Sequence, residues 1–304
     1  MLSIPDVVRR KALALDQGGW LDVLPDVVAE ICAEWSLSLG HVFGDATEAL
    51  VVEATLADGT SGVLKLLVPG RPDAARREAL VLDVAGGDGC ARLIRSDVER
   101  GVLLLERLGP SLHDLALPIR QRHEILCSTA QRVWRPARGI ELPSGAVKAR
   151  SLAERIPVEW EQLGRPCSEE AIDHALASAT RREAAHDERR AVLVHGDVHE
   201  WNALAAPEGF KLVDPDGMLA EPEYDLGVIM REDPTDLLIG DPRARSRWLA
   251  TRTGCQETAI WEWGVIERVS TGLLAERVGL QPVGRQMLAA ADRIARRDTY
   301  ADLR

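Results

Sequence analysis

The feature that most constrains the fold of this chain is a polar segment, HGDVHEWN at residues 195–202, that lies between two apolar runs. Residues 191–195 (AVLVH) predict a buried strand that ends at this segment, and residues 209–213 (GFKLV) predict a second strand that ends at Asp214. An isolated HGD tripeptide is also compatible with a polar turn after a strand. The second strand and its terminal aspartate favour another interpretation, in which the two strands hold polar side chains in place for chemistry.

Three of these side chains have the chemistry that phosphoryl transfer needs. The spacing H-x-D, with an asparagine five residues after the aspartate and a second aspartate at a strand end, is typical of kinases. Asp197 is the candidate catalytic residue, because its carboxylate can orient an attacking hydroxyl and accept the proton. Asn202 and Asp214 are the candidate metal ligands, because Mg²⁺ takes oxygen donors.

The N-terminal third of the chain has the pattern of an antiparallel sheet. Alternating apolar positions predict five strands, at 36–43, 48–57, 61–68, 91–96 and 101–106. The dipeptide Asp58-Gly59 predicts a hairpin turn between the second and third strands. Helical spacing predicts helices at 5–15, 25–34 and 72–85.

Helical spacing dominates after a turn at Leu108-Gly109-Pro110. The predicted helices cover 118–134, 148–163, 168–188, 222–231, 241–252, 256–278 and 282–297. The predicted fold class is therefore α+β, with a small antiparallel-sheet lobe at 1–107 and a larger helical lobe at 108–304. Ligands commonly bind in the cleft between two such lobes.

Lys65 is the candidate phosphate-binding residue of the first lobe. Only four of the 37 basic residues are lysines, so a lysine inside the apolar run VLKLL calls for an explanation. In kinases a strand lysine paired with a helix glutamate holds the nucleotide phosphates, and Glu78 lies thirteen residues further on in a predicted helix. The alternative is that Lys65 is an ordinary strand lysine exposed to solvent. Glu78 would then be an ordinary helix glutamate with no role in phosphate binding.

Two further nucleotide contacts are expected from the backbone. The carbonyl of Glu106 and the N–H of Leu108 would bind an adenine ring at the hinge, although a simple strand end before Gly109-Pro110 fits equally. A loop over the phosphates is expected near Gly40 and Gly44, where the N–H groups of residues 43–47 could cap an anion. An ordinary glycine-containing hairpin is the alternative there.

Composition narrows the class of protein. The net charge of −11 and the lack of a basic stripe with interleaved aromatic residues argue against nucleic-acid binding. No apolar run reaches membrane-spanning length and no signal peptide is evident, so a cytoplasmic location is expected. The five scattered cysteines predict neither a disulfide framework nor a zinc site. The sequence makes no prediction about oligomeric state.

Asp225 opens a predicted helix just after the metal segment. Its carboxylate could brace the backbone of the 195–202 loop, and it could also favour the helix dipole. His195 and His199 are four residues apart on a predicted loop rather than on a helix, which argues against zinc.

With these residues assembled, the chain resembles the aminoglycoside phosphotransferase family, which shares the fold of protein kinases. The family loop reads HGD-x-H-x-x-N, as residues 195–202 do here. A longer similarity, to the streptomycin 6-kinase and hydroxyurea phosphotransferase branch, runs through 214–217 (DPDG) and 221–225 (EPEYD). The C-terminal runs GVIMREDP, SRWLA and WEWGVIERVSTGLLA look most like streptomycin 6-kinases.

The resemblance implies a protein-kinase-like fold, ATP and Mg²⁺ as cofactors, and transfer of the γ-phosphate to a hydroxyl of an aminoglycoside, with streptomycin as the specific expectation. A cationic small molecule would be the partner, because carboxylates bind guanidinium groups as charge-assisted pairs. Acids of the helical lobe are the candidate substrate contacts, each with a surface charge as the alternative: Asp216, Glu232, Asp233, Glu262 and Glu267. Two alternatives remain open. The protein could phosphorylate hydroxyurea or another small hydroxylated metabolite, or it could be a pseudokinase that only binds nucleotide.

Overall fold

The computed structural model describes residues 3–44, 46–70 and 73–301. The chain divides into two compact units. The N-terminal unit consists of the residues up to Pro110 together with Leu204–Asp216, and the C-terminal unit of Ser111–Ala203 with the residues from Gly217 onward. The sequence predicted two contiguous lobes that meet at residues 107 and 108. In the structure, the segment 204–216 groups with the first unit although it lies far along the chain.

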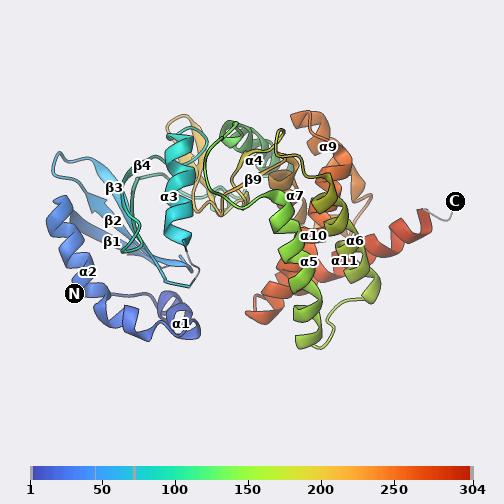
Figure 1. The fold of residues 1–304 in the computed structure, drawn as a ribbon, viewed down its shortest axis with the longest axis horizontal. Coiled ribbons are helices and arrows are strands. Elements are labelled where there is room, and N and C mark those ends of the chain that lie inside the picture. The colour runs from blue at the N-terminus through green and yellow to red at the C-terminus, as the bar shows by residue number, and fades with distance from the viewer. Residues whose placement is uncertain (1–2, 45, 71–72, 302–304) are drawn as a thin grey trace. The chain divides into compact units, whose positions relative to one another are not determined.

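A five-stranded antiparallel sheet of order β1-β2-β3-β5-β4 forms the centre of the N-terminal unit (Figure 1). Its strands are β1 (Ser38–Phe43), β2 (Ala49–Thr55), β3 (Ser61–Leu67), β4 (Leu93–Asp97) and β5 (Val102–Glu106). Gly59 has φ +85° in the turn between β2 and β3, a conformation that glycine adopts without steric cost. Each of the five strands coincides with a predicted one to within a few residues.

Alternation along β3 sends its side chains to two different faces of the sheet. Leu64 and Leu66 join a core with apolar residues of the preceding helix α2 (Gly18–Trp35), such as Ile31. Lys65, between them in sequence, points to the other face, where it meets α3 (Ala74–Ala85). The sheet therefore has an apolar face and a face that holds one buried cation. α1 (Asp6–Ala14) packs on α2 beside this sheet.

α2 differs from its expected span. The helix begins at Gly18, and Pro25, which was expected near its start, lies inside it. Proline in a helix removes a hydrogen bond, but Leu21, Leu24 and Val28 lie buried on one face of the helix, and that burial outweighs the loss. The predicted start of the helix at residue 72 lies outside the described residues.

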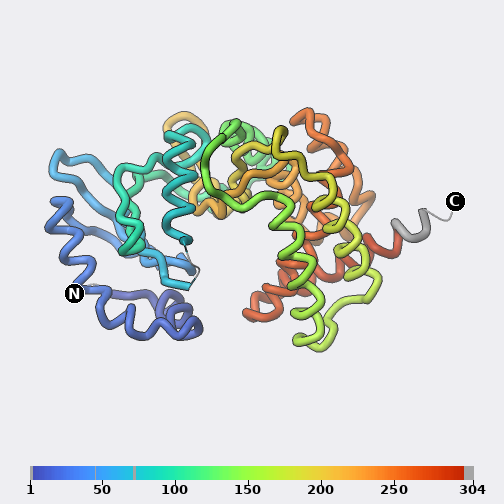
Figure 2. The backbone as a smooth tube through the Cα atoms, in the orientation of Figure 1, coloured from blue at the N-terminus to red at the C-terminus, as the bar shows by residue number. Residues whose placement is uncertain are grey.

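The C-terminal unit is mostly helical. α10 (Glu257–Arg277) is almost entirely buried, since its neighbours include α5 (Gly145–Gln162), α6 (Glu169–Ala185), α7 (Glu223–Arg231), α9 (Arg243–Thr253) and α11 (Val283–Ala301). The backbones of α5 and α6 run alongside each other (Figure 2). Ser144 and Ser168 cap these two helices by accepting hydrogen bonds from Val147 N and Ala171 N. α4 (Ile119–Val133) and the single-turn α8 (Pro234–Leu237) complete the helices of the described segments of this unit.

Short strands carry the polar segments. β6 (Val192–Val194) pairs with β9 (Met218–Ala220) in the C-terminal unit, and β7 (Ala203–Ala206) pairs with β8 (Gly209–Leu212). The segment 204–216 joins the N-terminal unit through backbone hydrogen bonds, from Leu212 N to Gly89 O and from Ala91 N to Leu212 O, both 2.8 Å. No helix within the described residues has the length and apolar composition of a membrane span.

Candidate active site

A buried lysine is the centre of the candidate site in the N-terminal unit. The Nζ atom of Lys65 lies 2.6 and 2.8 Å from the two carboxylate oxygens of Glu78, and 2.8 Å from Oδ1 of Asp214. β3, α3 and the end of the 204–216 segment each supply one of the three side chains. The structure therefore brings together the three residues that were expected to hold phosphates and metal in this unit.

Negative charge exceeds positive charge in this group, because the ammonium of Lys65 faces the two carboxylates of Glu78 and Asp214. Burial lowers the pKa of Lys65, but Asp214 and Glu78 outweigh this effect and the pKa is raised, so the ammonium stays charged. Burial raises the pKa of Glu78, and the negative charges of Asp214 and Asp216 act in the same direction against the attraction of Lys65. A further cation near Asp214 would relieve this excess of negative charge.

Asp214 is suited to hold such a cation. Its side chain is 50% exposed, although its Oδ1 accepts a hydrogen bond from the buried Lys65. Its backbone has φ +59°, in the left-handed region that aspartate tolerates better than most residues. The second carboxylate oxygen, Oδ2, has no protein partner among the described residues. A hard divalent cation binds such an oxygen.

In the C-terminal unit, the segment 195–202 forms a tight loop after β6. Asp225, near the start of α7, accepts hydrogen bonds from His195 N at 3.0 Å and from Gly196 N at 2.8 Å. The indole Nε1 of Trp134 donates to the same carboxylate at 2.8 Å. Gly196 has φ +90°, which excludes most other residues at this turn. The expectation that Asp225 braces the loop is confirmed.

The carboxylate of Asp197, on this loop, contacts several hydrogen-bond donors. Its Oδ1 accepts from Nη2 of Arg231 at 2.6 Å, and its Oδ2 lies 3.2 Å from both Nε2 of His199 and Nδ2 of Asn202. Burial raises the pKa of Asp197, but His199 and Arg231 outweigh it and hold the pKa well below its usual range. Asp197 is thus an ionised hydrogen-bond acceptor in a fixed orientation.

Two hydrogen bonds fix the orientation of the Asn202 amide. Its amide nitrogen donates to the backbone oxygen of Asp197 at 3.1 Å and to the carboxylate at 3.2 Å. This arrangement leaves the amide oxygen as the ligand-donating end of the side chain. Asn202 and Asp214 therefore both offer oxygen donors that fit Mg²⁺.

The residues expected at the hinge have local partners. The Glu106 carboxylate accepts from Arg92 N at 2.6 Å and pairs with Lys211, and the Leu108 carbonyl accepts from Arg107 Nη1 at 2.8 Å. The expected phosphate loop is only partly described, because residue 45 lies outside the described residues. Gly40 lies inside β1, at an irregularity of the β1–β2 pairing, rather than in a turn.

The acids proposed as substrate contacts fall into two groups. Glu262 and Glu267 are buried and already paired, Glu262 with Arg181 and Arg182 and Glu267 with Arg231. The side chains of Glu232 and Asp233 are about a fifth exposed, and they pair with Arg231 and Arg122 respectively. Asp216 is exposed in the N-terminal unit. Of these acids, Asp216 is the most exposed.

Sequence reasoning missed Arg231, which makes the shortest contact to Asp197. It lies in the run GVIMRED, where an arginine at the end of a helix has an ordinary explanation in the helix dipole. Sequence reasoning also missed Glu200, which binds Arg122 at 2.8 Å and His113 at 2.8 Å. Their long-range pairing has no periodic signal in the sequence.

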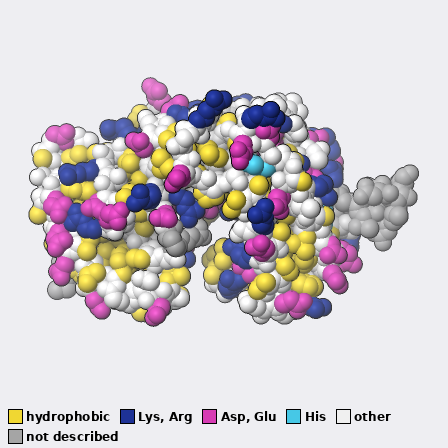
Figure 3. Space-filling model, in the orientation of Figure 1, with side chains coloured by type: hydrophobic (Ala, Val, Ile, Leu, Met, Phe, Trp, Pro, Cys, Tyr) yellow, Lys and Arg dark blue, Asp and Glu magenta, His cyan; other side chains and the backbone are white. Residues whose placement is uncertain are grey.

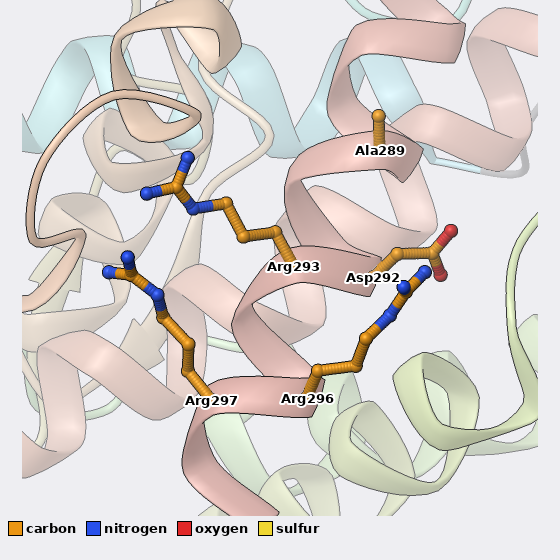
Figure 4. A pocket seen from close by; sticks show the side chains of 5 residues that line it. All are labelled: Ala289, Asp292, Arg293, Arg296 and Arg297. Carbon is orange, nitrogen blue, oxygen red and sulfur yellow. The ribbon is translucent and has the colours of Figure 1, made fainter.

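A surface pocket of about 430 Å³ on α11 lies among side chains that none of the motifs includes (Figure 4). Arg293 and Arg297 there both donate to the carbonyl of Gly240, at 3.0 and 2.9 Å. Acidic and basic side chains are interspersed over the face drawn in Figure 3, so neither sign of charge dominates it. None of the candidate site residues lines the pocket on α11, so the pocket is not part of the candidate active site.

Comparison with known proteins fits this geometry. Residues 34–260 match the family model described as aminoglycoside/hydroxyurea antibiotic resistance kinase. The chain belongs to this family. The predicted protein-kinase-like fold is confirmed by a similar solved structure, a thermostable mutant of aminoglycoside phosphotransferase APH(4)-Ia. The two structures superimpose with a TM-score of 0.59 at 13% identity, over 88% of this chain and 98% of the other.

Two curated relatives are similar in sequence. The hydroxyurea phosphotransferase of Kitasatospora aureofaciens is 31% identical over 68% of this chain and 61% of its own length. The streptomycin 6-kinase of Streptomyces griseus is 30% identical over 68% of this chain and 66% of its own length. The matched part of the chain thus covers 61% and 66% of the lengths of these two relatives.

Proposed function

We propose that the protein is an ATP- and Mg²⁺-dependent O-phosphotransferase that acts on a hydroxyl of a small molecule. The observation that carries the proposal is the buried ammonium of Lys65 between Glu78 and Asp214. A lysine held by a helix glutamate in this way is the phosphate-binding device of kinases. The expected adenine contacts at Glu106 and Leu108 belong to the same proposal.

Each side chain has one task in this reaction. Lys65 binds the nucleotide phosphates and Glu78 keeps its ammonium in place. Asp214 and Asn202 would hold Mg²⁺, which would supply positive charge to offset the charge that develops on the phosphate oxygens. Asp197 accepts the hydrogen bond of the acceptor hydroxyl and orients its oxygen for attack on the γ-phosphorus. The intact set of ionisable groups favours an enzyme over a pseudokinase.

An aminoglycoside, and streptomycin in particular, is the proposed acceptor. Support comes from the streptomycin 6-kinase of S. griseus and from the net charge of −11, which suits a cationic substrate. Asp216 is exposed and is a candidate partner for a guanidinium group, and Glu232 and Asp233 could serve as well if they left Arg231 and Arg122. Hydroxyurea is the second candidate, because a hydroxyurea phosphotransferase is 31% identical to the chain.

The acceptor is tested by measuring ADP release and phosphorylated product with streptomycin, a deoxystreptamine aminoglycoside, hydroxyurea, choline and homoserine. Streptomycin should stimulate ADP release, and the stimulation should weaken as salt screens exposed ion pairs beyond a Debye length of about 8 Å at physiological ionic strength. The Asp197→Asn variant is the control for non-enzymatic phosphate release. Product from hydroxyurea, choline or homoserine without product from streptomycin would overturn the aminoglycoside assignment.

We further propose a cytoplasmic location and no dependence on a nucleic acid or membrane partner. The five cysteines are free thiols, which suits a reducing compartment.

A further inference from the structure

An arginine from another element contacts the carboxylate of Asp197. Arg231 is the last residue of α7, and its Nη2 donates to Oδ1 of Asp197 at 2.6 Å. The remaining contacts of Asp197 come from its own loop, through His199 and Asn202. Arg231 is therefore the link between this carboxylate and the helical core of the C-terminal unit.

The other side of the Arg231 guanidinium is fixed by α10. Its Nη1 lies 3.1 Å from Oε2 of Glu267 and 3.1 Å from Oγ1 of Thr271. These two residues are four apart on a helix and so lie on the same face. The hydroxyl of Tyr224 donates to the other oxygen of Glu267 at 2.6 Å, so that both carboxylate oxygens are engaged.

Two glycines let α10 reach Arg231. A Cβ atom on Gly227 of α7 would come within 2.3 Å of the Cβ of Trp263, and one on Gly264 of α10 would come within 2.5 Å of the Cβ of Met230. The backbones of the two helices are therefore in contact at these positions. The close approach puts Glu267, one turn after Gly264, beside Arg231.

The backbone on both sides of Arg231 is also clamped. The buried Arg268 donates to the Met230 carbonyl at 2.8 Å, and Arg245 donates to the carbonyl of Glu232. A carbonyl on each side of the arginine thus has a buried guanidinium as its partner. Residues that hold a functional group in place are expected to be fixed by such packing and hydrogen bonds of their own.

We propose that Arg231, held by Glu267 and Thr271, is a positioning residue that sets the orientation of Asp197 toward the acceptor hydroxyl. Its guanidinium pairs with the three carboxylates of Asp197, Glu267 and Glu232, so its ionic partners among the described residues are all acids of the protein. The inference rests on the proposed phosphotransferase function. It also gives Glu267 a different task from the substrate contact expected from its charge.

Steady-state kinetics with the acceptor that the wild type phosphorylates test this role. Arg231→Met should lower kcat about 100-fold and leave the KM for Mg·ATP within about threefold, because a misplaced reactive group costs rate more than binding. Arg231→Lys should recover part of the loss, since it keeps the charge without the planar fork. Glu267→Gln, which keeps its volume, should lower kcat about tenfold. Arg247→Met, which removes an exposed pair with Asp241, is the matched control.

A wild-type kcat in both Arg231→Met and Glu267→Gln, or equal losses in these variants and Arg247→Met, would overturn the proposal. A second measurement needs no substrate and so separates failure of this inference from failure of the proposed function. In thermal unfolding, Asp197→Asn and Arg231→Met should be non-additive, the double variant losing less Tm than the sum of the single losses. Additive losses would overturn the contact even if no acceptor were found.

Discussion

Lys65 and Glu78 form a bidentate contact, 2.6 and 2.8 Å, between a strand and a helix that lie thirteen residues apart in the chain. Both side chains are almost fully buried, so the pair is isolated from water. A buried ion pair contributes little net stability compared with apolar packing, but breaking it leaves one charge without a partner. The pair is therefore explained better by the proposed role of Lys65 in nucleotide binding than by stability.

Replacement of this lysine should separate nucleotide use from folding. Lys65→Met should raise the KM for ATP strongly and lower the free energy of unfolding by about 3–5 kcal/mol, because Glu78 loses its partner. Lys11→Met removes an exposed pair with Glu48 and should change either quantity little. Kinetics and chemical denaturation of both variants measure the two effects. Equal KM values in the two variants would remove Lys65 from the nucleotide site.

Asp197→Ala should leave nucleotide binding nearly intact and lower turnover by about two orders of magnitude or more, because the acceptor hydroxyl loses the carboxylate that orients it. Binding is measured as the rise in Tm with Mg·ATP, and turnover as ADP release with acceptor. Turnover above about a tenth of the wild-type value would contradict the assignment of Asp197.

Asp214→Asn should shift the Mg²⁺ dependence of turnover to higher concentration, because a negative charge is lost from a small set of oxygen ligands. A titration of Mg²⁺ at fixed ATP measures the shift. Asp58→Asn, in the exposed turn between β2 and β3, is the control for a lost surface charge in the same unit. An Mg²⁺ titration that matches the wild type would exclude Asp214 as a ligand.

His199 should make stability depend on pH. Burial lowers the pKa of His199, but Asp197 outweighs it and raises the pKa above the usual value of about 6.5. A raised pKa in the folded state means that the charged histidine contributes stability below pH of about 6.5, and that the contribution is lost as the pH rises through the folded-state pKa. Wild-type stability should therefore fall, as the pH rises above about 6.5, more steeply than that of His199→Gln. Parallel curves, measured by denaturant unfolding, would contradict this, and His41→Gln on exposed β1 is the matched control.

Much of the fold could be predicted from periodicity, because the N-terminal sheet and the long helices each bury one regular face. β9 was not predicted, since its pairing with β6 is decided by a distant partner and by only three residues of sequence. The start of α5 at Gly145 rather than residue 148 follows from the Ser144 cap, a local signal that was overlooked.

Some of the site residues could likewise be predicted from the sequence, and others could not. Lys65, Glu78 and Asp214 were predictable because kinase chemistry requires those types in that order, and the structure brings them together. The paired state of Glu262 was not predictable, because Arg181 and Arg182 lie on α6, some eighty residues away in sequence. The charge of an acidic residue does not show whether its carboxylate is available to a ligand or is already paired with an arginine.

The membership of 204–216 in the N-terminal unit has a consequence for recombination between relatives. The chain passes from one unit to the other at Pro110–Ser111, at Ala203–Leu204 and again at Asp216–Gly217. A chimera that joins the first 110 residues of one homologue to the remainder of another would thus pair a Lys65 and Glu78 from one parent with an Asp214 from the other. Exchanging 204–216 together with the first 110 residues takes all three side chains from one parent, so this graft transfers the complete N-terminal unit.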